Sequence, residues 1–212
     1  MKKELISKYS SVYWLGGSTC AGKTTISNYL SENYGFMVYH CDEYLGKHIE
    51  KSNAEEHPNL FKLTTLKWED IINMPEDEYL KWIMDTFSEE FQMILEDLDT
   101  QTSDKPVLVE GINLLPKLLI DIIGEGNNAI WLVADEAFYS LHQMQRKELY
   151  DRINECKNPE QALHTYMNFD LAFGKYIKKE AQKLDLKVVI IENDNDIVKN
   201  IETVSTHYHL NL

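Results

Sequence analysis

The segment 17–24, with the sequence Gly-Ser-Thr-Cys-Ala-Gly-Lys-Thr, restricts the fold of this chain more than any other stretch. It contains two glycines five positions apart, followed by a lysine and a hydroxyl residue. Apolar residues at 12–15 precede it and predict a buried strand, and apolar residues recur behind it at helical spacing until Gly35. The turn therefore lies between a strand and a helix, where main-chain N–H groups at a helix N-terminus bind phosphate.

Each residue type in this turn has a chemical reason. The glycines allow a tight main-chain path, so that successive N–H groups point inward and surround a β-phosphate. Lys23 can reach the β- and γ-phosphates, and the hydroxyl of Thr24, or failing that Thr25, completes the coordination of Mg²⁺. The nucleotide-binding residues expected from the motif are Gly17, Ser18, Thr19, Cys20, Ala21, Gly22, Lys23, Thr24 and Thr25.

Short apolar runs alternate with helical patterns along the rest of the chain. This alternation is typical of a parallel sheet with right-handed crossovers, so we predict one α/β domain over 1–212 with helices on both faces. Strands are expected at 12–15, 36–40, 107–111, 129–133 and 187–191. Helices are expected directly behind the turn, from Pro75 to about Asp99, from Pro116 to Gly124, and from Ile197 onward.

A long segment separates the second expected strand from the third. Between Tyr44 and about Met74 the sequence is polar and irregular, and loops of this length in a compact domain are usually functional or disordered. We therefore assign about 44–100 to an insertion that binds a second substrate.

A carboxylate stands at the end of each of two expected strands. Asp42 follows the run 36–40, and Glu110 lies near the end of the run 107–111. In open α/β sheets, ligands bind outside the carboxyl ends of the strands. Asp42 is therefore expected in the same crevice as the turn, the alternative being a surface residue that caps the next turn.

Only two of the 21 basic residues are arginines, Arg146 and Arg152. Arginine meets phosphate oxygens with a planar fork, whereas lysine acts as a point charge, so this placement suggests phosphate binding rather than chance. The surrounding segment, about 136–159, could close over a nucleotide as a lid and exclude water, the alternative being an ordinary exposed helix.

Composition excludes several classes of partner. The net charge is −14 with no basic patch, so the chain should repel nucleic acids and anionic membranes. No apolar stretch has the form of a signal peptide or the length of a membrane span, which favours the cytoplasm. Three cysteines without disulfide or zinc spacing agree with this, and Cys20 is either a reactive thiol or a small filler residue.

Together the turn, the strand-end carboxylates and the two arginines resemble the P-loop small-molecule kinases. This family includes adenylate kinase-like enzymes, nucleoside, shikimate and gluconate kinases, chloramphenicol phosphotransferase and the zeta toxins. The resemblance covers the order of elements over nearly the whole chain, with motif agreement confined to the turn, Asp42, 107–111 and the arginines. It implies a five-stranded sheet with the first strand at its centre, and MgATP as the phosphoryl donor.

The resemblance also implies roles for individual residues. Lys23 and Thr24 match the phosphate and metal residues, and Asp42 matches a carboxylate that orients or deprotonates the acceptor hydroxyl. Glu110 stands where many members have a metal-orienting aspartate, and its longer side chain is a departure that leaves open whether it touches a magnesium-bound water or the substrate. The two arginines match lid arginines by location, and Asn193 lies where the family often contacts adenine.

The acceptor is the least determined part of the prediction. No arginine lies between the turn and residue 146, so a neutral or weakly charged small molecule with a hydroxyl group is favoured. A set of lysines in the insertion could nevertheless bind an anion, namely Lys47, Lys51, Lys62 and Lys67. An aromatic wall could form from Tyr44, Phe61, Trp68 and Trp82. The alternatives are a nucleotide or nucleotide-sugar kinase and a non-catalytic ATP-binding regulator, and the chain could act as a monomer or a homodimer.

Overall fold

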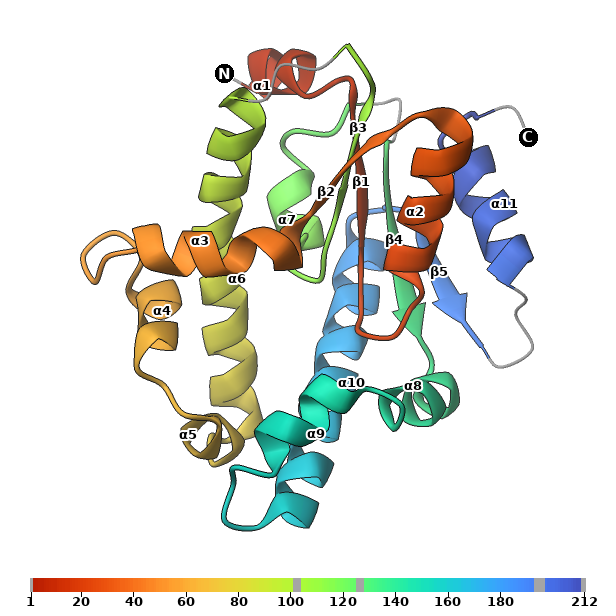
Figure 1. Cartoon of the computed structure of the whole chain (residues 1–212). Coiled ribbons are helices and arrows are strands. Elements are labelled where there is room, and N and C mark those ends of the chain that lie inside the picture. Colours follow the sequence, from red (N-terminus) through yellow and green to blue (C-terminus); the bar gives the residue numbers. More distant parts are fainter. Residues whose placement is uncertain (1, 101–103, 125–127, 193–196, 211–212) are drawn as a thin grey trace.

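Five parallel strands form one sheet at the centre of the computed structural model, in the order β2-β3-β1-β4-β5 (Figure 1). The structure describes residues 2–100, 104–124, 128–192 and 197–210. The strands are β1 (Val12–Gly17), β2 (Met37–His40), β3 (Val107–Glu110), β4 (Ala129–Ala134) and β5 (Val188–Ile191). The predicted sheet is confirmed, and β1, which leads into the glycine-rich turn, lies in its middle.

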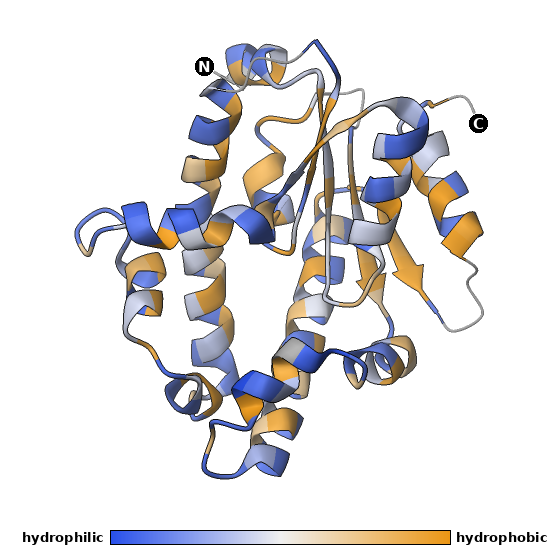
Figure 2. Ribbon diagram, in the orientation of Figure 1, coloured by the Kyte–Doolittle hydropathy of each residue, from blue (hydrophilic) through white to orange (hydrophobic). Residues whose placement is uncertain are grey.

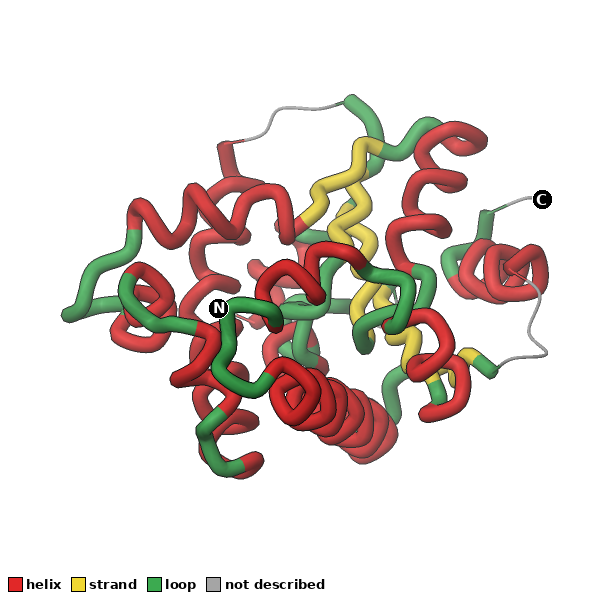
Figure 3. The backbone as a smooth tube through the Cα atoms, turned by 60° about the horizontal axis from the view of Figure 1, so that its bottom comes forward, coloured by secondary structure: helices red, strands yellow, loops and turns green. Residues whose placement is uncertain are grey.

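Helices cover both faces of the sheet, as the alternation of apolar runs predicts (Figure 3). The tryptophans of β1 and β4 point to one face, which is covered by α6 (Glu76–Thr100), α7 (Pro116–Leu119) and α10 (Pro159–Lys183). The leucines next to them point to the other face, against α2 (Lys23–Tyr34) and α11 (Ile197–His207). Figure 2 shows the apolar residues gathered along the strands and on the inner sides of these helices.

The segment between β2 and α6 is more helical than its sequence suggests. It forms α3 (Cys41–Lys51), α4 (Pro58–Phe61), a 3₁₀ turn η1 (Lys62–Thr64) and α5 (Trp68–Ile72), so the expectation of an irregular segment is wrong. Helix α3 begins at the residue after β2, without glycine or proline to mark the boundary. Its inward side chains are held by α6, a distant contact that a local pattern does not reveal.

Two further expectations need correction. The helix expected over 116–124 stops after the four residues of α7, and the apolar residues behind it form turns that pack into the core. Helix α10, 25 residues long, was not identified from the sequence, although proline stands at its first position and Asn158 caps it.

The chain also contains α1 (Lys2–Lys8), α8 (Glu136–Gln143) and α9 (Lys147–Ile153). Among the described helices, none combines the length and apolar character that crossing a membrane requires.

A buried ionic network joins α3 to α6. His48 is 0% exposed, and its two ring nitrogens lie 3.2 Å from Glu90 Oε1 and 3.2 Å from Asp97 Oδ2. Tyr39 donates a hydrogen bond to the same Asp97 oxygen, and Asn113 donates one to Glu90. Burial alone lowers the pKa of His48, but the hydrogen bonds with Glu90 and Asp97 outweigh it, so the pKa is raised above 6.5.

This network makes the stability of the protein depend on pH. A histidine whose pKa is raised in the folded state contributes stability that is fully present below its unfolded pKa and is lost as the pH rises through the folded value. We expect the free energy of unfolding of the wild type, relative to the double variant His48→Gln with Glu90→Gln, to fall by about 1–3 kcal/mol between about pH 6 and pH 9. Urea unfolding across this range measures it. Parallel pH profiles for the two proteins would contradict the assignment.

Candidate active site

The turn at 17–24 is shaped by three residues in the left-handed region of φ. Gly17 has φ 133°, Cys20 has φ 61° and Gly22 has φ 79°. The N–H of Ser18 donates to the carbonyl of Leu132 at 2.9 Å, and the hydroxyl of Ser18 accepts from the N–H of Ala134 at 2.9 Å. The phosphate loop, as we call residues 17–24 from here on, is therefore fastened to β4 before it turns into α2.

Lys23 folds back over the phosphate loop. Its Nζ donates a hydrogen bond to the carbonyl oxygen of Ser18 at 2.8 Å. Burial lowers the pKa of Lys23, the nearby charges of Glu110 and Asp42 raise it, and Arg146 lowers it again. All three charged side chains therefore lie within electrostatic reach of the ammonium group.

Thr24 and Glu110 lie side by side at the edge of the sheet. The hydroxyl of Thr24 donates to Glu110 Oε1 at 3.2 Å, and His40 Nδ1 lies 2.9 Å from the same oxygen. The register of β2 and β3 explains this, because His40 pairs with Glu110 across the ladder. Glu110 is 5% exposed, so its carboxylate is held in place by these partners.

These oxygens suit a magnesium ion. Mg²⁺ prefers oxygen ligands and binds through one or two protein groups, together with water and substrate phosphates. Thr24 and Glu110 supply a hydroxyl and a carboxylate of this kind, beside the phosphate loop. Among the described residues no group of three or more carboxylate, histidine or cysteine side chains is arranged to hold a metal ion, so the arrangement does not resemble a metal cage built by protein alone.

Asp42 is exposed in the first turn of α3. Its charge raises the pKa of Lys23, so it lies within electrostatic reach of the ammonium group although 19 positions of sequence separate the two residues. Asp42 therefore stands at the start of a helix that follows β2, and its role toward a substrate stays a prediction.

The two arginines have different surroundings. Arg146, between α8 and α9, acts on the pKa values of Lys23 and Cys20, which places it beside the phosphate loop. The guanidinium of Arg152 instead lies 5.5 Å from the centre of the Trp68 ring, in a cation–π contact. Only Arg146 of this pair is therefore next to the loop in this structure.

Cys20 is linked through its thiol to α8, which lies in the segment 136–159 (the lid segment). Its Sγ lies 3.0 Å from Oε1 of Gln143, a residue that is 1% exposed at the end of α8. Burial raises the pKa of the Cys20 thiol, which keeps it protonated at neutral pH. This favours a filler residue over a reactive thiolate. Asn193, expected to contact adenine, lies outside the described residues.

A buried carboxylate behind the loop was missed from the sequence. Asp170 on α10 is 6% exposed and accepts a hydrogen bond from the hydroxyl of Tyr139 at 2.9 Å. The missing signal was α10 itself: without a helix at this position, nothing marks Asp170 as the polar member of an apolar face that includes Phe169, Phe173 and Ile177.

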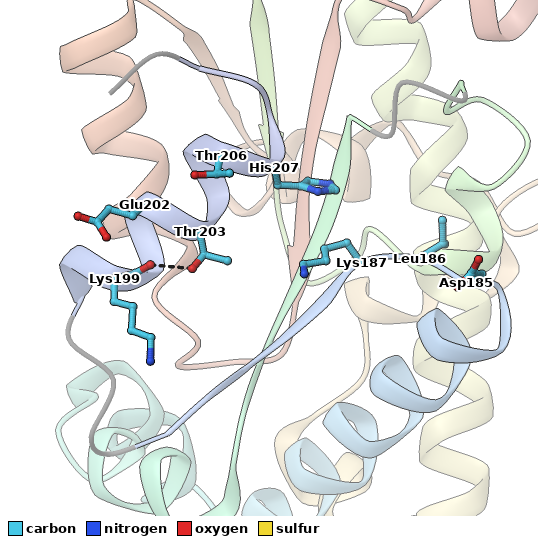
Figure 4. A pocket seen from close by; sticks show the side chains of 8 residues that line it. All are labelled: Asp185, Leu186, Lys187, Lys199, Glu202, Thr203, Thr206 and His207. Carbon is cyan, nitrogen blue, oxygen red and sulfur yellow. Dashed lines mark hydrogen bonds between the residues drawn. The ribbon is translucent and has the colours of Figure 1, made fainter.

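Cavities do not by themselves point to this site. One of about 690 Å³ lies between α11 and the connection from α10 to β5, lined by Lys187, Lys199, His207 and neighbouring residues (Figure 4). It contains none of the expected site residues. A smaller cavity of about 180 Å³ lies behind the phosphate loop, lined by Ser18, Tyr139 and Asp170 among others.

Comparison with known proteins gives likenesses in structure only. No protein-family model and no curated protein matches the chain. An uncharacterized protein from Eubacterium ventriosum matches with a TM-score of 0.49 and 14% identity over 93% of this chain and 97% of the other. Deoxyadenosine kinase from M. mycoides, with bound dATP, matches with a TM-score of 0.48 and 12% identity over 93% of this chain and 98% of the other. Shikimate kinase from Acinetobacter baumannii, in complex with shikimate, matches with a TM-score of 0.47 and 14% identity over 94% of this chain and 95% of the other.

Likenesses of this degree do not determine what this chain binds. The arrangement predicted from the sequence is present in the chain itself: the central β1, the parallel strands around it and the glycine-rich loop that joins β1 to α2.

The shape of the phosphate loop can be tested with two glycines. A Cβ at Gly17 would overlap the main chain of Leu132, at a φ that side chains rarely adopt, whereas Gly35 has φ 71° with no atom within 4 Å of such a Cβ. We expect Gly17→Ala to lower the free energy of unfolding by at least about 3 kcal/mol, or to prevent folding, and Gly35→Ala to cost about 1 kcal/mol. Thermal and urea unfolding compare the two. Equal losses would mean that the loop does not press against β4.

Proposed function

We propose that this protein is an ATP-dependent phosphotransferase that moves the γ-phosphate of MgATP to a hydroxyl group of a small molecule. The observation that carries the proposal is the gathering of Lys23, Thr24, Glu110 and Asp42 at one edge of the sheet, around a loop shaped by left-handed glycines. A loop of bare main chain beside an ammonium group fits a triphosphate, and a carboxylate next to it fits the hydroxyl that attacks.

In this proposal Lys23 moves from the carbonyl of Ser18 to the β- and γ-phosphates. That hydrogen bond is 2.8 Å long and keeps the ammonium group at the loop. Thr24 and Glu110 would hold Mg²⁺, and the ion, when bound, would neutralise negative charge on the phosphates.

Asp42 orients the acceptor and accepts the proton of its hydroxyl. An exposed carboxylate at the start of α3 can reach a substrate that lies between the phosphate loop and the α3–α6 region. Most of the rate enhancement in phosphoryl transfer comes from positioning and electrostatics, which a fixed carboxylate supplies. Arg146 stabilises the charge on the transferring group, and Arg152 joins it only if α9 moves toward the loop.

The base of the nucleotide fits the side of the loop that lies toward the end of α8 and the start of α11. Exposed apolar side chains occur on these elements, namely Leu141 on α8, Met144 directly after it and Ile197 at the start of α11. A Cβ at Gly22 would lie 3.6 Å from Cδ1 of Ile197, so the start of α11 adjoins the phosphate loop. Apolar side chains suit the faces of a purine, and we keep Asn193 as the proposed polar contact to adenine.

A neutral or cationic acceptor fits the site better than a phosphorylated one. Lys47 lies over the ring of Tyr44, and Lys51 lies 3.8 Å from Asp97, so two of the four insertion lysines have partners already. The carboxylates Asp42 and Glu110 would repel an acceptor phosphate. Of the expected aromatic wall, Trp82 is 7% exposed and belongs to the core, and Trp68 contacts Arg152.

We further propose that the enzyme acts in the cytoplasm on a soluble metabolite or drug, without nucleic-acid or membrane partners, as a monomer or a homodimer. The large net negative charge, −14, supports the exclusion of polyanionic partners.

Turnover tests the assignment directly. Purified protein with MgATP and a panel of nucleosides, sugars, sugar acids and antibiotics should release ADP in an acceptor-dependent way. Lys23→Ala should lower kcat/KM by at least about 10³-fold and Asp42→Asn by about 10²-fold. Turnover that survives unchanged in Lys23→Ala would exclude the proposed site. Nucleotide binding without any turnover, equal in wild type and Asp42→Asn, would select a non-catalytic regulator.

The charge of the acceptor is tested with matched pairs of compounds. Each unphosphorylated acceptor should outperform its monophosphate, by about 10-fold or more in kcat/KM, because the proposed site presents two carboxylates and two of the four insertion lysines have partners. Competition assays with each pair measure this ratio. Preference for the phosphorylated members would instead select a nucleotide or nucleotide-sugar kinase.

A further inference from the structure

We propose that Asp170 is a positioning residue, which holds the phosphate loop in its anion-binding shape from behind, through Thr19 and Tyr139, without touching the nucleotide. This inference rests on the proposed nucleotide site and adds a residue that no motif marks.

Helix α10 passes directly behind the phosphate loop. A Cβ at Gly174 would lie 3.4 Å from Cβ of Ser18, so the main chain of the helix and the loop are in contact at this point. Asp170 lies one turn earlier on the same helix and is 6% exposed.

The carboxylate of Asp170 joins two separate elements. It accepts a hydrogen bond from Tyr139 on α8 at 2.9 Å, and the side chain of Thr19 in the loop is near enough to lower its pKa. Tyr139 is 2% exposed, so its hydroxyl is removed from water and depends on this acceptor, and Thr19 beside it is 8% exposed. A shift of the loop would move Thr19 away from Asp170 and separate Ser18 from α10.

The charge of Asp170 has the wrong sign for phosphate binding. Burial raises its pKa to about 6, although the hydrogen bond with Tyr139, the nearby side chain of Thr19 and the charges of Arg146 and Lys23 lower it. At neutral pH it is therefore ionised close to the place where a polyanion would lie, and repulsion alone weakens nucleotide binding. Removing the charge of Asp170 should therefore weaken nucleotide binding if the carboxylate anchors the loop, and should strengthen nucleotide binding if its repulsion of the phosphates dominates.

Other ionisable groups face Asp170 from every neighbouring element. They are Cys20 and Lys23 of the loop and α2, Tyr139 and Arg146 of the lid segment, Tyr79 of α6 and Tyr166 of α10. The cavity of about 180 Å³ beside it adds Asp135, Glu136, Lys175 and Lys178. None of these normally changes charge between pH 5 and 8, so titration in this range reports mainly on Asp170.

The first experiment removes the charge and keeps the shape. Asp170→Asn is compared with the wild type and with Glu160→Gln, an exposed control on the same helix, by calorimetric titration with a non-hydrolysable MgATP analogue. At pH 8 we expect about 10-fold weaker binding in Asp170→Asn and no change in the control. At pH 5 the ratio of the two Kd values should fall toward one, because the wild-type carboxyl is then neutral too.

The ratio cancels the titration of the nucleotide itself, since both proteins bind the same ligand. A ratio that stays constant with pH would indicate a merely structural defect, and tighter binding by Asp170→Asn at pH 8 would show that repulsion exceeds anchoring. Either result would overturn the inference.

The second experiment keeps the charge and removes one donor, without any nucleotide. Tyr139→Phe leaves Asp170 ionised, and the rate of Cys20 alkylation at pH 8.5 then reports how firmly the loop is held. Cys41 and Cys156 are buried, so peptide mapping can separate Cys20 from them. We expect Cys20 to react at least about threefold faster in Tyr139→Phe, and an unchanged rate would contradict the anchoring. A wild type that binds no nucleotide would refute the proposed function, whereas this rate would still test the loop.

Discussion

The contact of the phosphate loop with β4 is the interaction on which the rest of the site depends. Gly17 lies against the main chain of Leu132 so closely that any side chain would overlap it, and Ser18 adds hydrogen bonds to Leu132 and Ala134. The N–H of Ser18 is used in this contact, so only the N–H groups that follow it in the loop are left for the proposed ligand. The support therefore has to come from neighbouring elements: β4 on one side and α10 behind.

This support explains the distribution of polar groups around the loop. In front are the groups suited to a substrate, such as Lys23, Thr24 and Asp42, which are at least partly exposed. Behind are Ser18, Thr19 and Asp170, all at least 92% buried and joined to the sheet or to α10. The loop thus has one side that carries the groups of the proposed binding site and one side that is buried against its supports, and the buried side accounts for residues that have no role in the proposed phosphate transfer.

How much of this could be predicted from the sequence depends on the range of the interactions involved. The strands, the phosphate loop and α2 follow from residues that are neighbours in the sequence, and the strand-end positions of His40 and Glu110 follow from the parallel register. Helix α3 was not predicted because it continues from β2 without a turn residue and is held by the distant pair His48 and Glu90. Asp170 was not predicted because its importance comes from burial against Thr19, 151 positions earlier in the chain. The different surroundings of Arg146 and Arg152 were likewise not predicted, because Arg152 contacts Trp68 and no local pattern connects Trp68 to residues 136–159.

We infer that the phosphate loop exchanges the hydrogen bond between Lys23 and Ser18 for a bound triphosphate. A crystal structure with Mg²⁺ and a non-hydrolysable ATP analogue would show this exchange. We predict the β-phosphate within hydrogen-bonding distance of the loop N–H groups, Lys23 Nζ moved from Ser18 to the phosphates, and the ion beside Thr24. A nucleotide bound elsewhere, with Lys23 still bonded to the carbonyl of Ser18, would refute the exchange.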